Sequence, residues 1–127
     1  MILVMLVDDK QTFMGIAKNR KYLRTKCVPF EPGKRANILE MINELVNPKD
    51  ITGIIVYVGP GPFTAIRVAV CIANALAFSL KVPLAGVKGI NDSEEILIKG
   101  LEKLGQSNAP VLPFYAKAPN ITKPKNK

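Results

Sequence analysis

Two stretches of the sequence hold residues whose types and spacing could do chemistry. Asp8 and Asp9 come directly after an apolar run, and a carboxylate at the end of a strand can bind Mg²⁺ or act as a general base. Asp8 is therefore a candidate nucleotide or Mg²⁺ ligand. The alternative is a pair of solvated carboxylates that end a strand, and we favour this alternative. The second stretch is the loop "GPGPFT", which also follows an apolar run.

The loop could hold a phosphate group or only make a bend. A glycine-rich turn between a strand and a helix can bind phosphate through its backbone N–H groups and the helix dipole. This loop matches neither G-x-x-x-x-G-K-[ST] nor G-x-G-x-x-G, and its two prolines each remove an N–H donor. We therefore interpret Gly59, Pro60, Gly61 and Pro62 as a rigid turn that positions the following helix.

The sequence lacks the residues that most other catalytic sites need. The sequence has no histidine, so Ser-His-Asp and Cys-His arrangements are excluded. Two distant cysteines, Cys27 and Cys71, are the only soft ligands, which argues against a zinc or catalytic iron site. Both lie in apolar contexts, and we expect free thiols in the core of a protein of the reducing cytoplasm. The sequence predicts no catalytic residue, no metal site, and a binding module rather than an enzyme.

Length and composition predict one globular domain. A chain of 127 residues with 48% hydrophobic side chains can bury a core without disulfides. We place that domain at residues 1–116 and expect 117–127 to be a basic flexible tail. No apolar run approaches the ~18 residues needed to cross a bilayer, so we expect no membrane association.

The positive charge is unevenly distributed. The net charge is +8, and the stretch from Lys10 to Arg35 holds eight Lys or Arg against Glu31 alone. The tail adds Lys117, Lys123, Lys125 and Lys127 without an acid. Such a field attracts RNA or an acidic partner, although a merely solvated surface is an equal alternative. No aromatic-rich RNA-binding signature accompanies the charge.

Apolar patterning gives the order of the elements that position these residues. It predicts antiparallel strands first, then helices alternating with further strands. The expected strands are Ile2–Val7, Thr12–Ala17, Tyr22–Val28, Ile51–Val58, 83–87 and 111–116. The expected helices are 34–47, Ala65–Leu80 with Thr64 as its cap, and one capped by Asp92 or Ser93 that runs to Leu104 before Gly105. This order predicts an α/β fold with a mixed sheet, the ribonuclease H-like half-domain of the actin-like ATPase superfamily.

The helix after the loop is apolar almost all round. An alanine recurs every fourth residue at 65, 69, 73 and 77, and Arg67, Cys71, Asn74 and Phe78 form a separate stripe at helical spacing. A sheet can cover only one side of such a helix. We therefore expect the other side to meet a neighbouring helix or a partner protein.

The segment "GPGPFTAIRVAVCIANALAFSLKVPLAGVKGI" resembles the "GPGSFTGLR…AKGLA…PL.GV" block of the TsaB (YeaZ) family. The flanks agree more loosely, with Asp8 at the family's first aspartate. Pro62 stands where the motif has serine and Ala65 where it has glycine. The chain is also too short to contain the family's second ribonuclease H-like half.

The resemblance implies a function. Members of this family are the non-catalytic partners in synthesis of threonylcarbamoyladenosine at position 37 of ANN-decoding tRNAs. It implies that the helix packs against a TsaD-type catalytic subunit, or forms a homodimer, together with the 34–47 helix. The partner-binding residues would be Phe63, Thr64, Arg67, Cys71, Asn74 and Phe78.

The resemblance also implies the other components. A TsaE-type ATPase is a further candidate partner, tRNA is reached indirectly through the complex, and the chain needs no cofactor of its own, with ATP bound only in the complex. The alternative function is a nucleotide-binding actin-like phosphotransfer enzyme or ATPase that uses Asp8 and the Gly-Pro loop.

Overall fold

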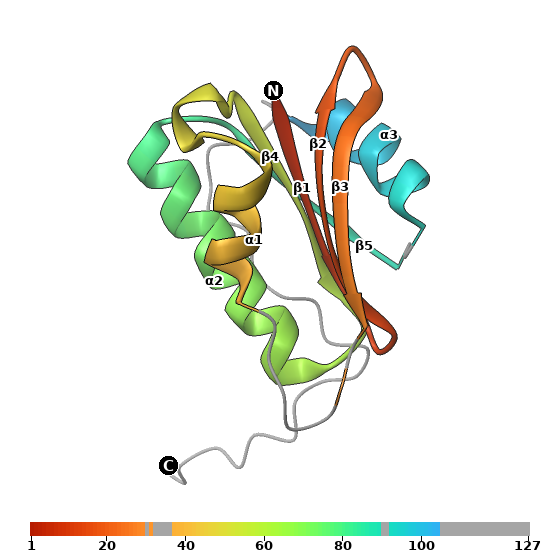
Figure 1. Ribbon diagram of the computed structural model, residues 1–127. Helices are drawn as coiled ribbons and strands as arrows, with labels where there is room; N and C mark the ends of the chain where they lie inside the picture. The colour runs from red at the N-terminus through yellow and green to blue at the C-terminus, as the bar shows by residue number, and fades with distance from the viewer. Residues whose placement is uncertain (30, 32–36, 90–91, 105–127) are drawn as a thin grey trace, which may run out of the picture.

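A mixed β-sheet lies between two layers of helix in the computed structural model, which describes residues 1–29, 31, 37–89 and 92–104 (Figure 1). Within these residues the sheet has five strands in the order β3-β2-β1-β4-β5. They are β1 (Ile2–Val7), β2 (Gln11–Lys18), β3 (Lys21–Pro29), β4 (Gly53–Gly59) and β5 (Leu84–Lys88). Strands β1, β2 and β3 pair antiparallel, whereas β1 with β4 and β4 with β5 pair parallel. The predicted mixed sheet is confirmed.

In the described part of the chain, three α-helices cover the two faces of the sheet. They are α1 (Ile38–Leu45), α2 (Phe63–Leu80) and α3 (Ser93–Lys103). Figure 1 shows α1 and α2 on one face and α3 on the other. Strand β4 begins two residues later than predicted, because a 3₁₀ turn at Pro48–Asp50 continues to Ile51, whose N–H donates to Pro48 O at 3.1 Å.

The helix starts follow local capping chemistry in two of the three cases. The Asn37 side-chain oxygen Oδ1 accepts from Glu40 N at 3.0 Å at the start of α1, and the Asp92 carboxylate accepts from Glu95 N at 3.1 Å at the start of α3. The prediction that Thr64 caps α2 is wrong. Pro62, with φ of −56°, is already suited to helix entry, and its carbonyl accepts from Ile66 N at 2.9 Å.

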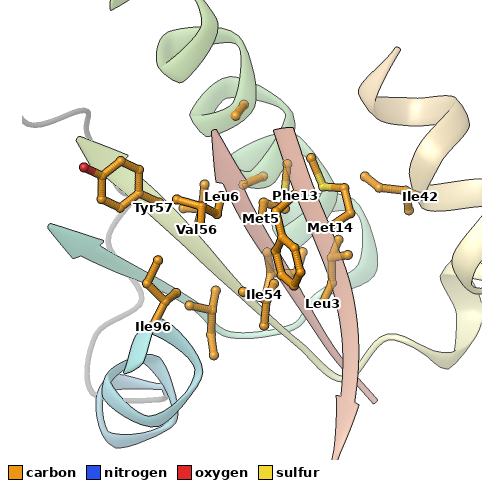
Figure 2. Packing of buried hydrophobic residues seen from close by; sticks show 14 of the residues in the cluster. Leu3, Met5, Leu6, Phe13, Met14, Ile42, Ile54, Val56, Tyr57 and Ile96 are labelled. Atoms are coloured by element: carbon orange, nitrogen blue, oxygen red, sulfur yellow. The ribbon is translucent and has the colours of Figure 1, made fainter. Parts of the chain in front are cut away.

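The central strands are buried on both faces, which explains their continuous apolar runs. Register places Leu3, Met5 and Met14 on the α1 and α2 face, where Ile42 of α1 packs near Met14 (Figure 2). Ile55 lies on the opposite face against α3, whose Ile96 is fully buried. The core therefore has two halves, one on each side of β1 and β4.

Several sequence-based expectations fall outside the described residues. These are the start of the 34–47 helix, the stop at Gly105, the strand at 111–116, and the tail at 117–127 with Lys117, Lys123, Lys125 and Lys127. The domain boundary after residue 116 lies there too.

Two further expectations are wrong. Cys27 and Cys71 are free thiols, but both are exposed rather than in the core, because Cys27 lies in the edge strand β3, which has no buried residue, and Cys71 lies on the side of α2 away from its buried residues. The view that no apolar run is long enough to cross a membrane fails for α2, whose 18 residues satisfy that criterion by length and composition. One side of this helix nevertheless packs on the sheet as a core helix does.

Gly100 tests the packing of α3 on the sheet. A Cβ at this position would overlap the side chain of Ile55, which is fully buried in β4. Gly100→Ala should therefore lower the free energy of unfolding by about 1 kcal/mol, a middle value of the overpacking cost less the gain in helix propensity. Overpacking costs about 1–3 kcal/mol, which exceeds the gain of about 1 kcal/mol from helix propensity. Urea unfolding measures the change. The exposed Lys99→Ala in the same helix is the control, and a Gly100→Ala protein more stable than wild type would contradict the packing.

Candidate partner-binding helix and its loop

The loop between β4 and α2 is held by hydrogen bonds to its own carbonyl groups. The Tyr57 hydroxyl donates to Pro60 O, and Gly89 N donates to Gly59 O at 2.9 Å. The Gly59–Pro60 peptide bond is cis, and Gly59 has a φ of 116°, a value that L side chains rarely adopt. These contacts fix the loop at the carboxyl end of β4.

The second glycine of the loop allows a close approach. A Cβ on Gly61 would lie 2.8 Å from Cδ1 of Ile66 in α2 and 3.7 Å from the Cα of Asp8. Gly61 therefore lets the loop pack between the first turn of α2 and the end of β1. This geometry supports the interpretation of Gly59, Pro60, Gly61 and Pro62 as a positioning turn.

The Asp8 carboxylate is buried and hydrogen-bonded to the backbone. Its side chain is 4% exposed, and Oδ1 accepts from Lys10 N at 2.8 Å and Gln11 N at 2.9 Å. These bonds close the turn between β1 and β2, so the favoured picture of a solvated carboxylate is wrong for Asp8, although Asp9 is exposed. Among the described residues, no group of three or more His, Cys, Asp or Glu could hold a metal ion.

The stripe on α2 points away from the sheet. Phe63, Thr64, Arg67, Cys71 and Phe78 are all exposed, and the Phe78 ring keeps 87% of its surface in solvent. The guanidinium carbon of Arg67 lies 5.1 Å from the centroid of the Phe63 ring, a cation–π contact that holds both side chains on the surface.

Asn74 is the least exposed member of the stripe. Its side-chain amide donates to Val70 O at 3.0 Å, one turn earlier in α2. The other five residues therefore offer more surface to a partner than Asn74 does.

The opposite side of α2 is the sheet-facing side. Its buried residues are Ile66, Ala69, Val70, Ala73 and Ala77. The alanines let the helix lie close to its own sheet. Ala69 is 1% exposed, so a charge at this position would unfold the core and could not report on an interface.

Some of the predicted site residues lie close together in the structure, and others lie apart. Asp8 and the Gly-Pro loop meet at the carboxyl ends of β1 and β4. Cys71, Asn74 and Phe78 follow the helix away from that point. Sequence reasoning missed Tyr57, which braces the loop. A single hydroxyl in the otherwise apolar strand β4, three residues before Pro60, was the available signal, because a buried hydroxyl needs a hydrogen-bond partner.

Comparison with families and curated proteins gives a consistent group of relatives. A family model described as "TsaD: tRNA N6-adenosine threonylcarbamoyltransferase" matches residues 35–110. The "tRNA threonylcarbamoyladenosine biosynthesis protein TsaB" of Bacillus subtilis (strain 168) is 26% identical over 94 residues. The protein of the same description from Buchnera aphidicola subsp. Acyrthosiphon pisum (strain APS) is 33% identical over 79 residues. The matches cover 68% and 58% of this chain but only 41% and 35% of those relatives. The chain thus spans less than half the length of the curated relatives it matches.

Solved structures share the fold. YeaZ from Pseudomonas aeruginosa superposes with a TM-score of 0.61 at 22% identity, covering 68% of this chain and 43% of that one. A second structure, described as an uncharacterized protein with similarity to peptidase YEAZ from Pseudomonas aeruginosa, gives a TM-score of 0.57 at 23% identity. It covers 68% of this chain and 42% of its own. The predicted ribonuclease H-like, actin-like fold is confirmed.

Tyr57 provides a test of the loop geometry that depends on pH. Burial, and then the charges of Asp8 and Asp9, raise the pKa of Tyr57 above its ordinary value of 10.0. Above pH 10 the unfolded chain releases this proton while the folded chain retains it. The free energy of unfolding should therefore fall as the pH rises through that range.

The variant Tyr57→Phe separates the hydroxyl from the ring. We expect it to lose about 1 kcal/mol at neutral pH, the usual net value of one hydrogen bond, and to show a shallower loss of stability above pH 10. Urea unfolding at pH 8 and pH 10.5 measures both. An unchanged pH dependence in Tyr57→Phe would show that the hydroxyl does not brace the loop.

Proposed function

We propose that this chain, which belongs to the TsaB (YeaZ) family, is a non-catalytic subunit that binds a TsaD-type catalytic subunit and supports threonylcarbamoylation of adenosine 37 in ANN-decoding tRNAs. Because the chain spans less than half of its curated relatives, the activity and partners of a full-length relative are part of the proposal. We infer that it acts in the cytoplasm, and that a TsaE-type ATPase is a further partner.

The exposed side of α2 is the observation that carries the proposal. It presents Phe63, Arg67 and Phe78, residue types that are enriched where interfaces bind most strongly. An 87% exposed phenylalanine on a helix whose other side is core is apolar surface that a partner could cover. α1 lies on the same face of the sheet and adds Leu39, which is 52% exposed (Figure 1). The positioning turn and Tyr57 would then act indirectly, by setting the direction of α2.

The alternative function, an actin-like phosphotransfer enzyme, has less support. Both backbone bonds of Asp8 Oδ1 serve the turn between β1 and β2, and two of the loop residues are prolines without an N–H. The name of the matching family model describes a transferase, but this sequence has no histidine, and the carboxylate oxygen Oδ1 of Asp8 accepts two backbone bonds of a turn. A binding role fits these residues better.

A single charge placed on α2 tests the proposed interface. Truncation of an aromatic anchor typically costs ~2 kcal/mol or more, and a charge left unpaired in the interface costs further. We expect Phe78→Asp to weaken binding to a co-expressed TsaD-type subunit from the same organism by about 30-fold or more. Size-exclusion chromatography and a titration measure complex formation, after circular dichroism has confirmed folding.

The control variant is Ile98→Asp. Ile98 lies on α3, on the opposite face of the sheet, and is 42% exposed, so the same charge enters a helix surface outside the proposed interface. Ile98→Asp should bind like wild type. A folded Phe78→Asp protein that binds as tightly as wild type would place the interface elsewhere. If Phe78→Asp alters only self-association, the face serves a homodimer instead.

A further inference from the structure

The hairpin formed by β2 and β3 is strongly cationic. Residues 11–29 include five basic side chains and no Asp or Glu. The basic residues are Lys18, Arg20, Lys21, Arg24 and Lys26. Lys26 pairs with Glu44 of α1. In the part of the chain that the structure describes, the other four make no ion pair, and all four are exposed.

The charged residues at the tip of this hairpin destabilise the fold in two ways. Asn19 and Arg20 have φ of 54° and 67°, so both residues of the turn are left-handed. Such turns favour Asn followed by Gly, and a bulky residue at the second position is strained. Lys18 and Lys21 also pair directly across the strands, an arrangement that is destabilising for like charges. Neither Arg20 at the turn nor the Lys18–Lys21 pair helps the hairpin to fold, and we infer a functional reason for these charges.

The aromatic side chains of the hairpin face inward. Phe13 is buried, and its ring meets that of Tyr22 edge to face with centroids 5.5 Å apart. The Tyr22 hydroxyl donates to Ser93 O at 2.7 Å, at the start of α3. Of the large apolar side chains on the hairpin, only Leu23, at 51%, is more than half exposed. The surface is therefore cationic with little apolar area. Phosphate groups suit such a surface, whereas a protein interface needs buried apolar anchors.

We propose that the β2–β3 hairpin, through Lys18, Arg20 and Lys21 with Arg24 behind them, directly contacts the phosphate backbone of tRNA. The identity of the RNA rests on the proposed function, while the phosphate chemistry rests on the hairpin alone. The contact is largely sequence-independent, because cations bind the phosphate backbone and neither aromatic ring of the hairpin is exposed to stack on a base: Phe13 is buried and Tyr22 is partly buried. Strand β3 is an edge of the sheet, and in Figure 1 the hairpin tip lies at the top of the view, across β1 and β4 from α2. RNA and a protein partner on α2 could therefore bind at the same time.

The test measures binding of the 127-residue chain to a transcribed ANN-decoding tRNA by fluorescence anisotropy over a range of KCl concentrations. The variant Lys18→Gln/Arg20→Gly/Lys21→Gln removes three charges and gives the turn its favoured glycine. We expect tRNA affinity to fall at least tenfold at low salt. The slope of log K against log[KCl] should become shallower by about 2, since each lost phosphate contact removes roughly 0.7–0.9.

A matched pair of single variants separates the site from the overall charge. Lys81, at the end of α2, is also an exposed cation with a left-handed backbone, at φ of 58°. Arg20→Gly and Lys81→Gly thus remove the same charge and relieve the same backbone conformation in two places. We expect only Arg20→Gly to weaken tRNA binding, with no fall in melting temperature for either.

Three results of the tRNA-binding measurements would overturn the proposal, and a fourth result, from co-purification, would assign the hairpin to a protein partner instead. The three are a wild-type chain that does not bind tRNA, a triple variant with the wild-type salt slope, and equal losses in Arg20→Gly and Lys81→Gly. If the triple variant keeps its tRNA affinity but no longer co-purifies with the TsaD-type subunit, the hairpin docks an acidic protein and the RNA contact is wrong. Failure of the proposed function is a separate result, because binding through α2 is scored with Phe78→Asp and without RNA.

Discussion

The burial of β4 on both faces is the constraint on which the rest of the structure depends. Every residue of Gly53–Gly59 is buried, so one helix must cover each side of this strand. α3 covers one side by approaching Ile55 so closely that a Cβ at position 100 would overlap the Ile55 side chain. α2 covers the other side with a face in which alanine recurs. Since α2 follows β4 directly, the loop that joins them determines where the uncovered side of α2 points.

That loop fixes the direction of α2 relative to the sheet. The Tyr57 hydroxyl and Gly89 N–H bind successive carbonyl groups of the loop, and Gly61 brings it against Ile66 and Asp8. Two prolines lack the backbone N–H groups that an anion would need as donors. The Asp8 carboxylate oxygen Oδ1 accepts hydrogen bonds from the turn between β1 and β2. Asp8 and the Gly-Pro loop, which suggested nucleotide chemistry, therefore stabilise the fold. The exposed side chains that could bind a partner lie along α2 and on the β2–β3 hairpin.

The sequence predicted the parts of the fold that depend on periodic burial. Continuous apolar runs identified β1 and β4, and the charged turn between β2 and β3 identified the hairpin, because these signals are local and strong. The cap of α2 was mispredicted since Pro62, rather than a hydrogen-bonding side chain, begins that helix. Apolar neighbours in sequence also misplaced both cysteines, because Cys27 lies in an edge strand with no buried residue and Cys71 lies on the side of α2 opposite its buried residues. The outward stripe was recoverable from helical spacing, whereas the role of Tyr57 depends on a loop conformation that no pattern encodes.

Cys71 allows the most direct measurement of the central claim, that the outward side of α2 is a docking surface. Cys71 lies on that side, while Cys27, an exposed thiol on β3 that is not in a disulfide and whose Sγ donates to Gln11 Oε1, serves as an internal reference. The rate of modification of each thiol by a soluble disulfide reagent can be followed by peptide mass spectrometry with and without a TsaD-type subunit. The account predicts that Cys71 is modified at least tenfold more slowly in the complex, while the rate at Cys27 is unchanged. A complex in which Cys71 reacts as fast as in the free chain would contradict it.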